Sequence, residues 1–327
     1  MKTWSDCLSS WVLMMSTRRK RTRSLIIFAS GMVLALQIFV GCKPVNKGFS
    51  GEMAYNHVEV LVNFGPREPG TEAIGKAQNY IEKELNGYGW KVLRQSFSDE
   101  TPIGLKRFVN LRARYSPDSD EIDWKDGGEK ILICSHYDTK IMENINFLGA
   151  NDGGSSTGVL IELGRVLSKD PERAKRIELV FFDGEEAVVD FTPVDGLYGS
   201  RYYAKYWRSA PRNKKPIAAY ILDLVGDENM RIDPPIDSPR HLLSELYKAS
   251  RQIGKKSLFG IHPTPITDDH VPLNAAGIPA LDIIDSDYIS GGKWHQEGDN
   301  LESVSPKSLN LIGDVMLQII ENTIPTN

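Results

Sequence analysis

The chain has 327 residues, of which 41% are hydrophobic and 25% are charged, and its formal net charge is −4. This length suits one large α/β domain or two small ones, and the composition is that of an ordinary globular protein. The negative charge, with no long basic stripe in the body of the chain, argues against a nucleic-acid partner.

The first predicted element is an export signal with a short linker over residues 1–48. The basic run RRKRTR stands directly before the apolar stretch LIIFASGMVLALQIFVGC, which is the pattern of a signal segment. Its end resembles a bacterial lipobox, in which the cysteine, here Cys42, is lipidated; a cleaved signal and an uncleaved membrane anchor are the alternatives. All three possibilities place residues 49–327 outside the cytoplasm. We expect a lipid-anchored protein of the bacterial periplasm or cell envelope.

The body, residues 49–327, is predicted to form a single domain. A helix is expected first, followed by two strands with alternating polarity and then by strands that alternate with helices. The expected strands are 90–97, 108–115, 130–138, 176–186, 218–227 and 278–284, and the expected helices are 71–89, 155–169, 238–254 and 305–322. This order predicts an α/β fold with a mostly parallel central sheet, helices on both faces, and an antiparallel edge formed by the early strand pair.

One cysteine falls within the predicted body. Cys7 and Cys42 lie in the signal segment, so Cys134 has no partner for an internal disulfide. Its neighbours in KILICSHYD are mostly apolar, which predicts a buried core thiol rather than a nucleophile.

Polar residues gather where the predicted strands end, which is where ligands bind in such sheets. SHYD ends one strand with His136 and Asp138, whose two-residue spacing puts them on one face. GANDGG, DGEE, LDLVGD and WHQEGDN add the other candidates: Asp152, Glu185, Glu186, Asp223 and His295. Each alone would be a turn, cap or surface residue, but carboxylates and imidazoles at successive strand ends fit an open zinc site.

Two adjacent glutamates, Glu185 and Glu186, follow the strand RIELVFF. On an extended backbone, adjacent side chains point to opposite faces, so the two carboxylates cannot have the same role. We therefore expect one of them to hold a ligand and the other to act on it.

Several segments carry a family resemblance. SHYD, GANDGGSSTGV, FFDGEEA and WHQEGDN resemble the metal-binding signatures of the M28 family of zinc aminopeptidases. Within it, FFDGEEAVVDFTPVDGLYGSR, ILDLVG, TDDHVPLNAAGIPAL and WHQEGDNLESVS are similar to the glutaminyl cyclases, and FFDGEEA with LYGSR and DDHVP is specific to that branch. The resemblance runs from about Asn63, where NFGPREPGT also matches, to the C-terminus.

The resemblance implies a zinc centre. Asp152, Glu186 and His295 match the three ligands of one zinc ion per chain, and Glu185 matches the catalytic acid/base. The implied reaction converts the N-terminal glutamine of peptides or proteins to pyroglutamate with release of ammonia. Zinc would polarise the γ-carbonyl oxygen, and Glu185 would move a proton from the attacking amine to the leaving nitrogen.

The resemblance also implies supporting roles. Asp223 and Asp268 match the two acids that complete the proton network, and we expect a hydrogen bond between them. Trp294 and Phe191 would supply apolar walls for the substrate side chain. Two positions depart from the family pattern, because animal cyclases have histidine at the position of Asp282 and tryptophan at the position of Phe191. No catalytic role is assigned to Asp282 on this basis.

The chief alternative is an M28 aminopeptidase, which uses two zinc ions to activate water. His136 and Asp223 are residue types that a second zinc would need, so His136 and Asp138 are candidates either for a second metal ion or for supporting the first. Asp268 and Trp294 favour the cyclase, because aminopeptidases typically have serine and tyrosine there. A zinc protein that binds peptides without turnover is a third reading.

Overall fold

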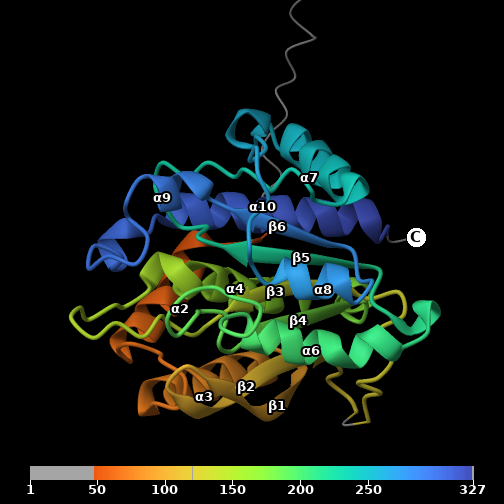
Figure 1. Cartoon of the computed structure of the whole chain (residues 1–327). Coiled ribbons are helices and arrows are strands. Elements are labelled where there is room, and N and C mark those ends of the chain that lie inside the picture. The colour runs from red at the N-terminus through yellow and green to blue at the C-terminus, as the bar shows by residue number, and fades with distance from the viewer. Residues whose placement is uncertain (1–47, 120, 326–327) are drawn as a thin grey trace, which may run out of the picture. The chain divides into compact units, whose positions relative to one another are not determined.

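The computed structural model describes residues 48–119 and 121–325 (Figure 1). Residues 1–47 of the predicted signal segment, including Cys42, lie outside the described residues. Within the described ranges, no helix has both the length and the apolar character needed to cross a membrane.

A six-stranded mixed sheet forms the centre of the described domain, in the order β1-β2-β4-β3-β5-β6. The neighbours among β4, β3, β5 and β6 pair in parallel, whereas β2 pairs antiparallel with both β1 and β4. The mostly parallel sheet with an antiparallel edge is therefore confirmed. The strands are β1 (Trp90–Thr101), β2 (Gly104–Tyr115), β3 (Ile131–His136), β4 (Ile177–Phe182), β5 (Ala218–Asp223) and β6 (Ala280–Ile284).

Helices cover both faces of this sheet (Figure 1). Buried side chains of α2, α3, α4, α7 and α10 belong to one core, and those of α6 and α8 belong to another. The sequence predicts α3, α4, α7 and α10 but not α2 or α6. The α-helices are α2 (Gly51–Asn63), α3 (Glu72–Gly87), α4 (Ser156–Leu167), α5 (Pro171–Ala174), α6 (Tyr198–Ser209), α7 (Arg240–Gln252), α8 (His270–Ala275), α9 (Ser286–Ser290) and α10 (Pro306–Thr323).

Strand β3 shows why the central strands read as continuous apolar runs. Ile131 and Ile133 pack into the core under α4, while Leu132 and Cys134 pack into the core under α6. Both faces are covered, so successive side chains are all buried. Cys134 is a free, fully buried thiol whose pKa is raised by burial, as expected of an inert core cysteine.

Candidate active site

The residues predicted from the strand ends do converge at one edge of the sheet. His136 is the last residue of β3 and Asp223 is the last residue of β5. These strands are parallel, so their carboxyl ends meet at the same edge. The turn after β4 brings Glu185 and Glu186 to this edge as well.

Asp152, Glu186 and His295 form the first candidate metal group. Each offers one ligand atom, and these atoms all lie within 4.8 Å of one another. His295 Nε2 lies 3.0 Å from Glu186 Oε1 and 3.5 Å from Asp152 Oδ2. Asp152 Oδ2 and Glu186 Oε2 are buried and make no hydrogen bond among the described residues. Two carboxylates and one imidazole with unpartnered oxygens fit a zinc ion that keeps an open position.

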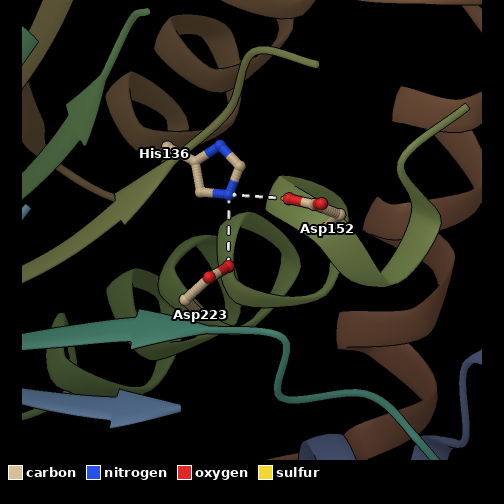
Figure 2. A group of neighbouring side chains, drawn as sticks. All are labelled: His136, Asp152 and Asp223. Atoms are coloured by element: carbon tan, nitrogen blue, oxygen red, sulfur yellow. Dashed lines mark hydrogen bonds and ion pairs between the residues drawn. The ribbon is translucent and has the colours of Figure 1, made fainter. Parts of the chain in front are cut away.

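His136, Asp152 and Asp223 form a second group next to the first, shown in Figure 2. His136 Nε2 lies 3.2 Å from Asp152 Oδ1 and 3.1 Å from Asp223 Oδ1. Asp152 therefore offers one oxygen to each group. On the other side of the ring, His136 Nδ1 lies 3.5 Å from Asp138 Oδ1. The four side chains have the residue types of either a second metal site or a hydrogen-bonded support for the first.

The two glutamates lie in a turn, because β4 ends at Phe182 rather than at residue 186. Gly184 has φ +71° and turns the backbone away from the sheet. The Asp138 carboxylate accepts hydrogen bonds from the backbone N–H groups of Glu185 (3.1 Å) and Glu186 (3.3 Å). The expectation that Glu185 and Glu186 point apart because they lie on an extended strand is therefore wrong, since both lie beyond the end of β4. This clamped turn positions both side chains.

The two glutamate side chains differ in their partners. Glu186 joins Asp152 and His295, whereas Glu185 belongs to none of the candidate metal groups among the described residues. Burial raises the pKa of Glu185 well above its ordinary value, although the charge of His136 acts in the opposite direction. A buried carboxyl with a raised pKa can both accept and release a proton near neutral pH.

Asp152 sits in an irregular helical segment, η1 (Ala150–Ser155), that is interrupted at Asp152 and Gly153. Gly153 has φ +73°, and a Cβ atom there would lie 2.9 Å from His136 Cε1. Only glycine allows this backbone to approach the histidine so closely. Asp299 accepts hydrogen bonds from the N–H groups of Asn151 (2.6 Å) and Asp152 (3.0 Å), which fixes the segment in place.

Two of these supporting residues have no role in the sequence analysis. Asp299 lies in the quoted segment WHQEGDN, and Arg67 lies in NFGPREPGT. The fully buried Arg67 guanidinium donates to the carbonyls of Tyr137 (2.8 Å), Leu148 (2.7 Å) and Gly149 (2.8 Å). It thereby ties the segment after β3 to the start of η1. Their presence in matched segments is a signal, but no local pattern reveals their partners.

Aromatic rings flank the third candidate ligand. Trp294 stacks on His295 with ring centroids 3.7 Å apart, and Phe147, which the sequence analysis missed, meets the same imidazole edge-on at 5.5 Å. His295 has φ +55°, an uncommon conformation for a residue other than glycine. The packing therefore holds this imidazole in a strained but defined position.

Phe191 lies beside the glutamate turn. A Cβ atom at Gly196 would lie 2.7 Å from Phe191 Cδ1 and 3.3 Å from the Glu185 carbonyl oxygen. The ring and the turn therefore pack against the same glycine. Of the two predicted wall residues, Trp294 therefore packs on the His295 imidazole and Phe191 lies near the glutamate turn.

Asp268 and Asp223 are less directly connected than expected. No hydrogen bond joins them among those of the described residues, and Asp223 Oδ1 is paired with His136 instead. Burial raises the pKa of Asp268, and the charge of Asp223 raises it further. Asp268 instead forms a third group with His270 and Asp282, whose ligand-type atoms lie within 4.8 Å of one another.

The model of Peptidase family M28 matches residues 113–320, which is more than half of the chain. The chain belongs to peptidase family M28. This match spans β3 to β6 and most of α10, and it contains all the candidate metal-binding and catalytic residues described above, while the supporting Arg67 precedes it.

Several M28 relatives and structural neighbours of this chain are glutaminyl cyclases. A glutaminyl cyclase structure from an Acidobacteriales bacterium is 34% identical, has a TM-score of 0.74, and covers 84% of this chain and 95% of that one. The glutaminyl-peptide cyclotransferase of Boiga irregularis is 28% identical, over 79% of this chain and 76% of the relative. The resemblance to the cyclase branch is therefore confirmed.

A second kind of neighbour is also similar. The structure of a leucine aminopeptidase precursor from Bacteroides thetaiotaomicron is 26% identical, has a TM-score of 0.71, and covers 84% of this chain and 97% of that one. Proteins named as glutaminyl cyclases and as an aminopeptidase precursor therefore share this fold, so the function must be argued from the site.

Proposed function

We propose that the chain is a zinc-dependent glutaminyl-peptide cyclotransferase that converts the N-terminal glutamine of peptides or proteins to pyroglutamate. The observation that carries the proposal is the clamped glutamate turn. It places Glu186 with Asp152 and His295, and it leaves the buried Glu185 beside this group without a metal-type partner. The similarity to glutaminyl cyclases over most of the chain supports the same activity.

Asp152, Glu186 and His295 would hold the zinc ion, with one ion per chain. Their unpartnered oxygens and the imidazole nitrogen supply a ligand set that zinc accepts. When bound, zinc supplies Lewis-acid polarisation of the γ-carbonyl of the substrate. The two buried carboxylates also gain a counter-charge that offsets the cost of their burial.

The remaining residues move and hold protons. Glu185 takes a proton from the α-amine as that nitrogen forms a bond to the γ-carbon, and it delivers the proton to the amide nitrogen as the old C–N bond breaks and ammonia leaves. Asp268 and Asp223 accept hydrogen bonds from the departing nitrogen. Trp294 and Phe191 form apolar walls that exclude water. No external nucleophile is needed, because the substrate supplies its own amine.

An aminopeptidase is the second candidate function. Asp152 offers one oxygen to His136, as Figure 2 shows, and its other oxygen to His295, which is the arrangement that a pair of metal ions would use. A metal pair would activate water for hydrolysis of the first peptide bond. Asp268 and Trp294 favour the cyclase, because M28 aminopeptidases typically have serine and tyrosine at these positions.

Product analysis separates the two functions. Residues from about 49 onward, purified with zinc, should convert a glutamine-led peptide to a blocked product lighter by one ammonia and leave leucine- and alanine-led peptides intact. Asp268→Ala should suppress the conversion and keep the metal. Release of free N-terminal amino acids, with two zinc ions per chain, would replace the cyclase with the aminopeptidase.

We also propose that the protein is exported and lipid-anchored at Cys42, on the strength of the basic run and the lipobox-like segment. Proteins that expose glutamine after signal cleavage would then share its compartment. Metabolic labelling with a fatty acid should mark the wild type and leave Cys42→Ala unmarked. Labelling of both, or of neither, would refute the lipoprotein assignment.

A further inference from the structure

Asp282 is a fully buried carboxyl in the middle of β6. It pairs directly with Ile221 of β5, so it points to the same face as Ile221 and as Asp223, two residues further along. Helix α8, which begins at His270, packs against both strands. Asp282 therefore lies between the sheet and the start of this helix.

The start of α8 brings further polar groups to Asp282. His270 Nδ1 lies 3.6 Å from Asp282 Oδ2, and a carboxylate oxygen of Asp268 lies within 4.8 Å of both residues. The backbone N–H of Asp269 donates to Asp268 Oδ1. Among the described residues, Asp268 Oδ2, His270 Nδ1 and both Asp282 oxygens have no hydrogen-bond partner. Buried polar atoms normally have partners, and a proton held by one of these facing groups would supply one.

The charges around Asp282 are nearly all negative. Asp223 faces it from β5, and Asp268 and Asp269 face it from the segment before α8. Burial raises the pKa of Asp282 well above its ordinary value, and the charges of Asp268 and Asp223 raise it further. Burial also lowers the pKa of His270, so this imidazole stays neutral and supplies no positive charge. Two ionised carboxylates this close would repel each other, so one of them keeps a proton.

We propose that Asp282 is a positioning residue, which keeps a proton and donates it in a hydrogen bond to Asp268. The N–H of Asp269 and the O–H of Asp282 would then hold the Asp268 carboxylate from two sides and fix its rotation. A carboxylate has about four lone-pair sites, so sites remain for the departing nitrogen. The proton stays between the two carboxyls throughout turnover, and the proton delivered to ammonia comes from Glu185. This inference rests on the proposed cyclase activity.

Two substitutions of similar size test the hydrogen bond in the purified full-length protein. Asp282→Asn keeps a donor, and Asp282→Leu removes it. On a glutamine-led peptide, Asp282→Asn should keep kcat within about threefold of the wild type, whereas Asp282→Leu should lower kcat by about 100-fold, the effect of misplacing a reacting group. KM and the zinc content should stay the same in both variants, because neither binding nor the metal depends on Asp282.

The pH profile supplies a readout that a purely structural role would not change, and it does not require Asp282→Leu to fold. Wild-type kcat should fall at alkaline pH when the pair of carboxyls loses its proton. Asp282→Asn has no such proton to lose, so its alkaline limb should move to higher pH. An unmoved limb, an Asp282→Leu variant with wild-type kcat, or an equal loss in Asp282→Asn and Asp282→Leu would overturn the proposal.

Two other outcomes have distinct meanings. Loss of a second equivalent of metal in Asp282→Asn would show that Asp268, His270 and Asp282 hold a cation, and it would also overturn the proposal. A wild-type protein without cyclase turnover would remove the proposed function, and the positioning role with it. An active wild type with an equally active Asp282→Leu variant would remove the positioning role alone.

Discussion

Strand β4 has a buried glutamate near one end and two more just beyond the other, and their surroundings are opposite. Glu178 faces two guanidinium groups, with Arg112 Nε 2.6 Å from Oε1 and Arg114 Nε 2.6 Å from Oε2. Burial raises its pKa, but these positive charges overcome burial and leave the pKa below its ordinary value. Glu185 and Glu186 face other acids, and both have raised pKa values because of burial.

The different surroundings indicate that Glu178 has a structural role, whereas Glu185 and Glu186 have functional roles. At Glu178 the carboxylate is bound by two guanidinium groups of the same chain, and this cluster joins β2 to β4. Around Glu186 the carboxylates outnumber the cations, and oxygen atoms stay unpartnered. Such an arrangement costs stability in the free protein, and a bound cation or substrate can recover that free energy.

The largest expected effect is at the glutamate turn. Glu186→Gln should lose the metal and with it all turnover, because one of three ligands is gone. Glu185→Gln should keep the metal and lose about 10²- to 10⁴-fold in kcat, the usual contribution of an acid/base group. Metal analysis and steady-state kinetics on the two variants check this contrast. If Glu185→Gln emptied the metal site, the roles of the two residues would be reversed.

At the opposite end of β4, substitution should affect stability alone. Glu178→Gln leaves Arg112 and Arg114 buried without a carboxylate, which should cost about 3–5 kcal/mol of unfolding free energy. Denaturant unfolding measures this loss. Glu72→Gln, which breaks an exposed pair with Lys76, is the control and should change stability little. A large fall in the kcat of folded Glu178→Gln would contradict the purely structural role proposed for Glu178.

His57 in α2 is a further buried ionisable side chain, and the fold favours its neutral form. Its Nδ1 lies 2.6 Å from the Tyr80 hydroxyl, and burial, followed by the charge of Arg165, lowers its pKa to about 4. The unfolded chain binds a proton near pH 6.5, so the folded state is favoured above that pH and loses stability as the pH falls from 6.5 to 4. The loss should reach up to about 3 kcal/mol.

Denaturant unfolding of the wild type and His57→Gln at several pH values between 7 and 4 checks the prediction for His57. Glutamine does not titrate, so the variant should show a shallower pH dependence in this window. Parallel curves for the two proteins would contradict the assignment.

The smallest effect is expected at Asp138, whose carboxylate holds the backbone of the glutamate turn. Asp138→Asn replaces one of the two acceptor oxygens with an N–H₂ donor that faces a backbone N–H, so Glu185 and Glu186 should lose their defined positions. Metal affinity and kcat should each fall by about 10- to 100-fold, as for other groups that orient metal ligands. Metal titration and kinetics test this. Full activity in Asp138→Asn would mean that the turn holds its shape without the clamp.

Much of the fold follows from local patterns in the sequence. The central strands, four of the helices and the gathering of ligand-type residues at strand ends come from hydrophobic periodicity and position. Helix α6 was missed, since its sequence YGSRYYAKYWRS is polar apart from its aromatic residues. The early end of β4 was also missed, because the backbone conformation of Gly184 decides it.

The supporting contacts of the site could not be predicted. Asp138, Asp299 and Arg67 act on the backbone of residues that are distant in the chain. A carboxylate that accepts from a remote N–H leaves no periodicity or spacing in the sequence. Family resemblance names the segments in which such residues lie, but only the three-dimensional contacts show what they hold.

The position of His295 has a consequence for the order of folding. Asp152 and Glu186 follow strands in the middle of the sheet, whereas His295 comes after every strand and shortly before α10. When a chain folds from its N-terminus, the third side chain arrives only after the segment between β6 and α10 has docked. High-affinity metal uptake should thus be a late event. A chain that ends before α9 would lack both His295 and α10, so it should remain metal-free even if its sheet assembles.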